Sequence, residues 1–257
     1  MATTHDVSIT VEGLTRSFGL VTALDGIDLD LDGPEIVGIA GPNGSGKTTL
    51  IRCLLGLLRP QSGSASVNGT NSMDLKSTER ARIGYMPQSE AVYDGLTVRE
   101  NVAFFARLYG VDSAAIDRAL SFVDLEDRAD AAVTDLSGGM VRRTSLACAL
   151  VHDPDVLFLD EPTVGVDPEL RASLWNAFHD RRDHGTLSLV STHYLGEAEK
   201  CDRVLFLRSG RVLALDTPTA ILDATHTDDL EDAFLALLDR EETVSLASGS
   251  DAVGVVR

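Results

Sequence analysis

An eight-residue run has the residue types and spacing of a phosphate-binding loop. It consists of Gly41, Pro42, Asn43, Gly44, Ser45, Gly46, Lys47 and Thr48. Glycines let successive backbone N–H groups turn towards an anion, and the start of a following helix adds partial positive charge. In this pattern the lysine reaches the β- and γ-phosphates and the threonine hydroxyl binds Mg²⁺. We therefore predict a nucleoside triphosphate site here, to which we add the adjacent Thr49.

Two carboxylates, Asp160 and Glu161, directly follow the apolar segment 156–159. Such a segment predicts a buried strand, and ligands of parallel sheets bind at the carboxyl ends of strands. We expect Asp160 to hold the hydration shell of Mg²⁺ and Glu161 to polarise the attacking water. Acidic pairs after strands are common, so this prediction depends on the phosphate loop upstream.

Strand and helix patterns that alternate along the chain predict a mostly parallel sheet covered on both faces by helices. The predicted strands are 7–11, 27–31, 35–40, 65–67, 83–86, 156–159, 187–191, 204–207 and 211–215. The predicted helices are 47–58, 137–150, 169–182, 194–200 and 230–238. Residues 97–127 form a further helical stretch, for which Thr97 and Glu100 predict a capping box. This stretch belongs to a strand-free insertion over about residues 90–135.

Three further features appear in a fixed order with these motifs. Gln88 follows Tyr85-Met86-Pro87, the run Leu136-Ser137-Gly138-Gly139-Met140 precedes a predicted helix, and His193 follows a predicted strand. Over residues 7–238 the ordered set resembles the nucleotide-binding subunit of ABC (ATP-binding cassette) transporters. This resemblance implies a P-loop NTPase core of the α/β class, with a mostly parallel central sheet, an N-terminal antiparallel β region and a helical insertion subdomain.

The resemblance also implies that ATP binds between two head-to-tail subunits, in a homodimer or a heterodimer. Ser137, Gly138 and Gly139 would offer a hydroxyl and backbone N–H groups to the γ-phosphate held by the other subunit, at a helix N-terminus. Met140 departs from the usual glutamine of this motif, and its side chain cannot donate a hydrogen bond. The alternative for Ser137 is a simple helix cap.

Four other residues receive roles from the resemblance, each with an ordinary alternative. Gln88 would contact Mg²⁺ or the attacking water, or is a turn residue. His193 would bond the γ-phosphate and support Glu161, or is a polar surface residue. Asp167 would lie in the loop between subunits, or caps a helix. Phe18 would stack on adenine, or belongs to the core.

The composition is globular and acidic. Lys and Arg number 22 against 40 Asp and Glu, for a net charge of −18, which argues against a broad basic face for nucleic acid. Only three of the basic residues are lysines, and Asp outnumbers Glu by 27 to 13. We interpret this as adaptation to concentrated salt; a merely acidic cytosolic protein is the alternative.

Nothing in the sequence predicts a membrane span, and the short polar start, residues 1–6, predicts no secretion signal. Three widely spaced cysteines (Cys53, Cys148 and Cys201) indicate a reducing, cytoplasmic setting. We expect one ATPase domain over 1–240, with its helical subdomain at about 90–135. Residues 241–257, rich in Ser, Gly and Ala, are expected to form a flexible tail.

The resemblance makes a transport motor the first hypothesis: an ATPase at the cytoplasmic face of the membrane that acts through separate membrane-spanning permease subunits. Residues 104–110 and 230–234 look like those of drug, antibiotic and polysaccharide exporters, although import stays open. A soluble cassette ATPase that acts on DNA, ribosomes or iron–sulfur assembly is the alternative. The third hypothesis is a regulator that binds a nucleotide without hydrolysing it. The presence of Glu161 and His193 is evidence against this hypothesis. The sequence does not identify the transported substrate.

Overall fold

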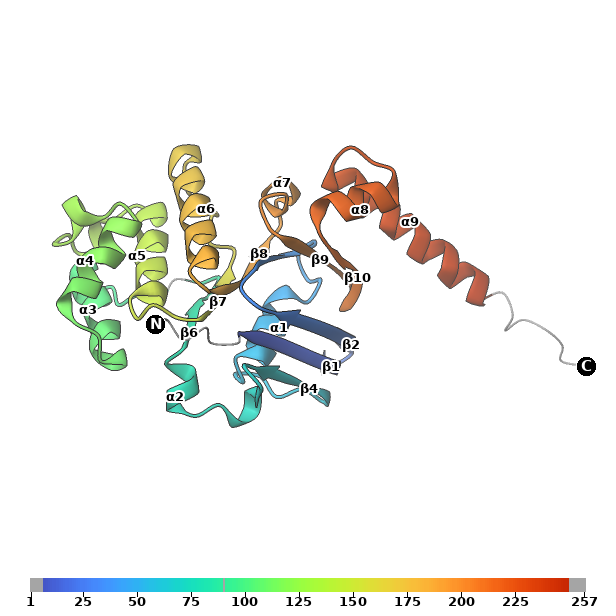
Figure 1. Cartoon of the computed structure of the whole chain (residues 1–257), viewed down its shortest axis with the longest axis horizontal. Coiled ribbons are helices and arrows are strands. Elements are labelled where there is room, and N and C mark those ends of the chain that lie inside the picture. Colours follow the sequence, from blue (N-terminus) through green and yellow to red (C-terminus); the bar gives the residue numbers. More distant parts are fainter. Residues whose placement is uncertain (1–6, 90, 250–257) are drawn as a thin grey trace, which may run out of the picture.

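The computed structural model describes residues 7–89 and 91–249. A small sheet and a larger sheet form its centre, and helices from the middle of the chain stand to one side (Figure 1). This arrangement confirms the predicted α/β class with an N-terminal antiparallel region and a helical insertion. The predicted polar N-terminus, residues 1–6, and the last part of the predicted tail, 250–257, lie outside the described residues.

The small sheet is antiparallel throughout. It consists of β2 (Val21–Asp32), β1 (Ser8–Phe18), β4 (Ser62–Val67) and β5 (Thr70–Asn71), in that order. The alternating apolar and acidic residues of β2 bury Ile27, Leu29 and Leu31 and expose Asp28 and Asp30. A half-exposed strand is therefore confirmed, because successive side chains of a strand point to opposite faces.

The larger sheet is parallel except at one edge. Its strands, in order, are β10 (Arg211–Asp216), β9 (Arg203–Arg208), β3 (Ile36–Ala40), β8 (Leu187–Thr192), β7 (Val156–Asp160) and β6 (Ile83–Met86). Only the β9–β10 pair is antiparallel. Every residue of β3, β7 and β8 is buried, as expected for strands covered on both faces. β3, β8 and β7 are parallel neighbours. The phosphate loop after β3 and the acidic pair at the end of β7 therefore lie at the same edge of the sheet.

The helical insertion contains two helices where the sequence predicted one stretch. α3 (Val98–Tyr109) begins at Thr97, whose capping box with Glu100 is confirmed, and α4 (Ser113–Phe122) begins at Asp112. Gly110 ends α3 with a φ of 72°, a left-handed conformation that glycine adopts without steric cost. Two short 3₁₀ turns, Glu126–Arg128 and Val133–Asp135, lead out of the insertion.

The remaining helices pack around the two sheets. They are α1 (Lys47–Leu54), α2 (Ser77–Arg80), α5 (Gly138–Leu150), α6 (Pro168–Asp183), α7 (Leu195–Ala198), α8 (Pro218–Thr225) and α9 (Leu230–Gly249). A 3₁₀ turn, Ser72–Asp74, lies between β5 and α2.

Several predicted helix ends are wrong. α1 stops before the predicted Leu58 because Gly56 turns the chain with a φ of 65° and the N–H groups of Leu57 and Leu58 return to the Arg52 carbonyl. α7 is shorter than predicted, and α8 was not predicted. α9 continues to Gly249, so residues 241–249 are helical where a loose tail was expected. Figure 1 shows α9 projecting from the side of the molecule opposite the helical insertion.

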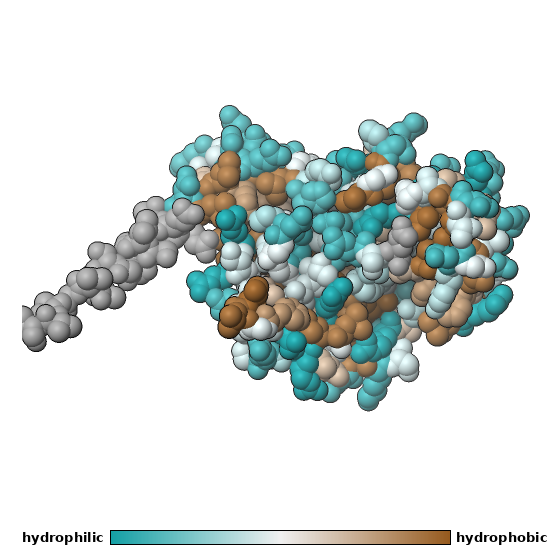
Figure 2. All heavy atoms as spheres, turned by 180° about the vertical axis from the view of Figure 1, so that it is seen from behind, coloured by the Kyte–Doolittle hydropathy of each residue, from teal (hydrophilic) through white to brown (hydrophobic). Residues whose placement is uncertain are grey.

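The surface is mostly hydrophilic, with separate hydrophobic patches on the face seen in Figure 2. The acidic composition is compatible with a source that lives in concentrated salt, but that habitat stays a prediction. Within residues 7–89 and 91–249, no helix combines the length and the apolar character needed to cross a bilayer.

We predict that Phe158→Ala lowers the free energy of unfolding by about 3–5 kcal/mol. Phe158 is fully buried in β7, two residues before Asp160, and its removal leaves a cavity that rigid neighbouring strands cannot fill. Urea denaturation of the two proteins measures the difference. Leu20→Ala is the control, because Leu20 is fully exposed, and its effect should stay within about 0.5 kcal/mol. Equal stability of wild type and Phe158→Ala would contradict the prediction.

Candidate functional site

The loop between β3 and α1 has the backbone geometry of an anion cradle. Gly41 and Gly46 have φ values of 153° and 114°, and a Cβ there would stand 2.2 Å from the Leu207 carbonyl oxygen and 2.5 Å from that of Ala23, respectively. Only glycine fits both positions. The N-cap residue of α1 is Gly46, and among the described residues no side-chain cap is found there. The first N–H groups of α1 are therefore available to a phosphate.

Lys47 lies inside this loop, only 6 % exposed. Its Nζ donates to the carbonyl oxygens of Gly41 at 2.7 Å and Pro42 at 3.1 Å. Burial lowers the pKa of the Lys47 ammonium, and the nearby charges of Glu161 and Asp160 oppose that shift. The hydroxyl of Ser45 in the same loop is buried without a hydrogen-bond partner among the described residues. These groups can exchange their present contacts for phosphate oxygens.

Asp160 and Thr48 meet at the predicted metal site. The Thr48 hydroxyl donates to Asp160 Oδ2 at 2.8 Å, and the Ser191 hydroxyl donates to Asp160 Oδ1 at 2.5 Å. Hydroxyl and carboxylate oxygens are the donors that Mg²⁺ prefers. Ser191, at the end of β8, was missed by sequence reasoning. β8 contains three hydroxyl residues, Ser188, Ser191 and Thr192, and nothing in the sequence distinguishes the one that reaches Asp160.

Two predicted residues, Gln88 and His193, converge on Glu161. Gln88 Nε2 donates to Glu161 Oε2 at 3.2 Å, and His193 Nδ1 lies 3.3 Å from Glu161 Oε1. The Glu161 N–H donates to the carbonyl and hydroxyl oxygens of Ser191 at 3.2 and 3.0 Å. Glu161 has a φ of 56°, a left-handed conformation that is rare for residues other than glycine. A buried carboxylate held this way can orient a water molecule and accept its proton.

Arg142, on the second turn of α5, is a further residue that sequence reasoning missed. Its guanidinium donates to the backbone carbonyl oxygens of Gln88, Asp160 and Glu161. In the sequence, Arg142 is simply one of the adjacent pair Arg142 and Arg143 on a predicted helix. No pattern distinguishes the one that reaches the site.

Comparisons with known proteins agree with this geometry. Residues 24–164 match the family model described as ABC transporter. The chain belongs to the ABC transporter family. It is 38 % identical, over 89 % of its own length and 77 % of the relative's, to the Nod factor export ATP-binding protein I of Paraburkholderia xenovorans. It is 36 % identical to the probable multidrug ABC transporter ATP-binding protein YbhF of Escherichia coli, over 92 % of this chain and 42 % of that one.

Solved structures of ABC proteins have the same fold. The structure of an ATP binding subunit of an ABC transporter superposes with a TM-score of 0.82 at 29 % identity, over 90 % of this chain and 99 % of that one. A dimeric post-hydrolysis state of the ATP-binding cassette MJ0796, bound to ADP and Pi, gives a TM-score of 0.75 at 25 % identity, over 81 % and 98 %. The chain is therefore an ABC ATPase, and the phosphate loop and the acidic pair stay its predicted ATP site.

The run Ser137-Gly138-Gly139-Met140 lies at the start of α5. Ser137 caps the helix by accepting from the Met140 N–H at 3.3 Å, so the capping alternative is confirmed. Ser137 and Gly138 are exposed, whereas Met140 packs partly against the core. Within the described part of the chain no hydrogen bond joins Ser137, Gly138 or Gly139 to the phosphate loop. Contact with a nucleotide on a second subunit stays a prediction.

Asp167 caps α6, so the helix-cap alternative for this residue is confirmed. Its carboxylate accepts from the Leu170 N–H at 3.0 Å, and this bond lowers the pKa of Asp167. The side chain is exposed, so capping leaves it accessible to a second subunit. The loop before it approaches α5, since a Cβ at Gly139 would lie 2.9 Å from the Gly165 carbonyl oxygen.

Phe18 is a surface residue, 48 % exposed, at the end of β1. The core alternative is therefore wrong. The Arg16 guanidinium lies over the Phe18 ring, 4.9 Å from its centroid. Stacking on adenine stays a prediction for Phe18.

We predict that Phe18→Ala raises the KM for ATP about tenfold, because base–aromatic stacking contributes about 1–3 kcal/mol. Steady-state hydrolysis at varied ATP measures the change. Phe18→Tyr is the control, since it keeps a ring of the same size and should keep the KM within about twofold. An unchanged KM in Phe18→Ala would remove this side chain from the ATP site.

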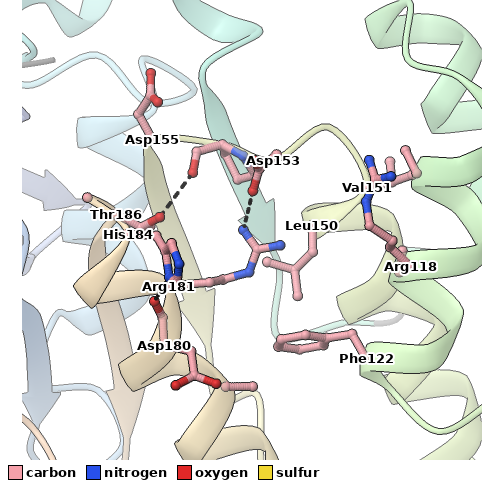
Figure 3. A pocket seen from close by; sticks show the side chains of 15 residues that line it. Arg118, Phe122, Leu150, Val151, Asp153, Asp155, Asp180, Arg181, His184 and Thr186 are labelled. Atoms are coloured by element: carbon pink, nitrogen blue, oxygen red, sulfur yellow. Dashed lines mark hydrogen bonds and ion pairs between the residues drawn. The ribbon is translucent and has the colours of Figure 1, made fainter. Parts of the chain in front are cut away.

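A cavity of about 470 Å³ lies away from these residues, between α4, α6 and the loop after α5. Figure 3 shows Arg181 directed towards Asp153 and Phe122 across it. Arg181 Nη1 lies 3.0 Å from Asp153 Oδ1, and its guanidinium lies 5.5 Å from the centroid of the Phe122 ring. None of its lining residues is a predicted site residue. The cavity marks the junction between the helical insertion and the core.

Proposed function

We propose that this ABC ATPase powers export through separate membrane-spanning permease subunits, at the cytoplasmic face of the membrane. The observation that supports ATP hydrolysis is that Gln88 and His193 both contact Glu161, beside the phosphate loop. A nucleotide-binding regulator without hydrolysis would not require this arrangement. Export rather than import is supported by the relatives, which are a Nod factor export protein and a multidrug transporter protein.

The geometry supports the following division of labour between the site residues. Lys47 and the N–H groups at the start of α1 bind the phosphates of ATP. Glu161 accepts the proton of the attacking water, while Gln88 and His193 orient its carboxylate. Thr48 and Asp160 would hold Mg²⁺, which supplies charge neutralisation at the β- and γ-phosphates. A direct contact between Gln88 and Mg²⁺ stays a prediction, because its amide nitrogen bonds Glu161.

Two copies, or this chain and a sister subunit, would enclose the ATP. Support comes from the exposed start of α5 and the exposed Asp167, which leave Ser137 and its neighbours free to meet a second subunit. The similar cassette MJ0796 forms a dimer in its post-hydrolysis state. In the proposed dimer the Ser137-Gly138-Gly139 donors face the γ-phosphate bound by the other subunit.

Purification of the tagged full-length chain from its native membranes tests the transport proposal. We expect an integral protein with several membrane spans to co-purify. In vesicles, the pair should then hydrolyse ATP and move a substrate away from the ATP side. Co-purification of ribosomal, DNA-bound or iron–sulfur assembly proteins in place of a membrane protein would favour the soluble alternative.

A cysteine cross-link tests the dimer. In a chain carrying Ser137→Cys and Gly44→Cys, the head-to-tail arrangement predicts a disulfide-linked dimer that forms with ATP under oxidising conditions. The chain with Ser137→Cys alone is the control. No ATP-dependent cross-link in the double variant would contradict the head-to-tail dimer.

A further inference from the structure

Arg142 makes contacts that connect three parts of the catalytic site. Its Nε donates to the Glu161 carbonyl oxygen at 2.9 Å, and its Nη1 to that of Gln88 at 2.9 Å. Its Nη2 donates to the Asp160 carbonyl oxygen at 2.7 Å. Arginine presents five N–H donors in a rigid plane, so one side chain can hold all three carbonyl groups at once.

Two of these carbonyl groups lie on either side of the Glu161 Cα. The Asp160 carbonyl belongs to the peptide group before Glu161, and the Glu161 carbonyl to the one after it. The directions of these two peptide planes define φ and ψ of Glu161. A φ of 56° costs a non-glycine residue of the order of 1 kcal/mol and persists only where its surroundings hold it. Arg142 fixes this conformation through the two carbonyl groups, and Ser191 fixes it by accepting from the Glu161 N–H.

The third contact brings Gln88 into the same unit. Arg142 fixes the backbone of Gln88, whose side chain donates to the Glu161 carboxylate. The Arg142 guanidinium therefore holds the backbone of both Gln88 and Glu161, and through Gln88 it also affects the Glu161 carboxylate. A shift of these backbone groups by about one ångström would displace the Glu161 carboxylate from its water. Misplacement of that size can lower a reaction rate about 100-fold.

We propose that Arg142 is a positioning residue for ATP hydrolysis, which fixes the backbone on both sides of Glu161 and ties Gln88 to it. This inference rests on the proposed role of Glu161 as the group that activates water. Arg142 touches neither phosphate nor water in this role. It acts only through the residues it holds.

Arg143 provides a matched control on the same helix. It too donates to two backbone carbonyl groups, those of Val123 and Asp124, and it pairs with the Asp124 carboxylate. These partners belong to the end of the helical insertion. Arg143→Ala therefore removes the same chemical group and the same kind of contact from α5, away from Glu161.

The first experiment compares steady-state hydrolysis and ATP binding in wild type, Arg142→Ala, Arg142→Lys and Arg143→Ala. We expect kcat to fall about 10- to 100-fold in Arg142→Ala, with the Kd for ATP within about threefold. Arg142→Lys should recover only part of the rate, because an ammonium cannot hold three carbonyl groups in one plane. Arg143→Ala should keep kcat within about twofold. Wild-type kcat in Arg142→Ala would overturn the proposal. If Arg142→Ala does not fold, the rate of Arg142→Lys decides the same question.

A double-variant cycle separates positioning from a general loss of structure. If Arg142 acts through Glu161, adding Arg142→Ala to Glu161→Gln should change the residual rate by less than about twofold, because effects within one unit are not additive. Multiplication of the two separate losses would overturn the proposal. Rapid hydrolysis by Glu161→Gln alone would instead refute the role of Glu161, and absence of wild-type hydrolysis would refute the proposed function.

Discussion

Replacing Glu161 by Gln is expected to slow ATP hydrolysis by about 10²- to 10⁴-fold while ATP binding is preserved. The amide has the shape of the carboxylate and can still contact Gln88 or His193, but it cannot accept a proton from water. Phosphate release at saturating ATP measures the rate, and equilibrium binding of radiolabelled ATP measures the affinity. The Kd should change by less than about threefold, since the proposed role of Glu161 concerns the water rather than the nucleotide.

The same variant should accumulate an ATP-bound dimer, because hydrolysis no longer reopens it. Size-exclusion chromatography with ATP and Mg²⁺ shows this species. Glu199→Gln is the control, since Glu199 is an exposed glutamate after α7 and its loss should leave rate and oligomeric state unchanged. Turnover near the wild-type rate in Glu161→Gln would exclude Glu161 as the group that activates water.

Replacing Lys47 by Ala is expected to weaken ATP binding by about 10- to 150-fold for each hydrogen bond lost, because a hydrogen bond to a charged group contributes about 1.5–3 kcal/mol. Lys47 is buried with its Nζ against two loop carbonyl groups, so its ammonium group is already held at the phosphate loop. The Kd for ATP measures the effect. The loop backbone should persist, since Gly41 and Gly46 define its course.

Lys76→Ala is the matched control, because Lys76 is exposed and lies just before α2, outside the site. It should bind ATP as the wild type does. Lys47→Arg should not restore affinity, because the larger planar group does not fit a site in which Lys47 is only 6 % exposed. Unchanged affinity in Lys47→Ala would mean that the loop amides alone hold the phosphates.

The parts of the site that sequence reasoning found are those that need a particular residue at a particular point of one strand or loop. The glycines of the phosphate loop are required by backbone conformation, and Asp160 follows a segment apolar enough to predict a buried strand. Arg142 and Ser191 could not be found in this way. Their roles depend on which neighbouring strand ends they reach, and a carbonyl group, which every residue has, leaves no trace in the sequence.

The fold was predicted best where burial decides the pattern. β3, β7 and β8 are buried on both faces and were found to within one residue at each end. The break after α3 was missed although Gly110 and Asp112 are typical end and start residues, and so was α8, which Thr217 and Pro218 introduce. Hydrophobic periodicity identified α9 as far as Leu238, and among the side chains that the structure describes Leu237 and Leu238 pack partly against the core.

The three thiols lie beneath the surface, with Cys53, Cys148 and Cys201 each no more than 5 % exposed. Burial raises the pKa of Cys53 to about 11 and that of Cys148 to about 12, so the reactive thiolate is scarce at neutral pH. A maleimide dye or spin label would therefore attach to an added surface cysteine and spare the native ones. Distances between labelled subunits can thus be followed through the ATP cycle in a chain that keeps its natural core.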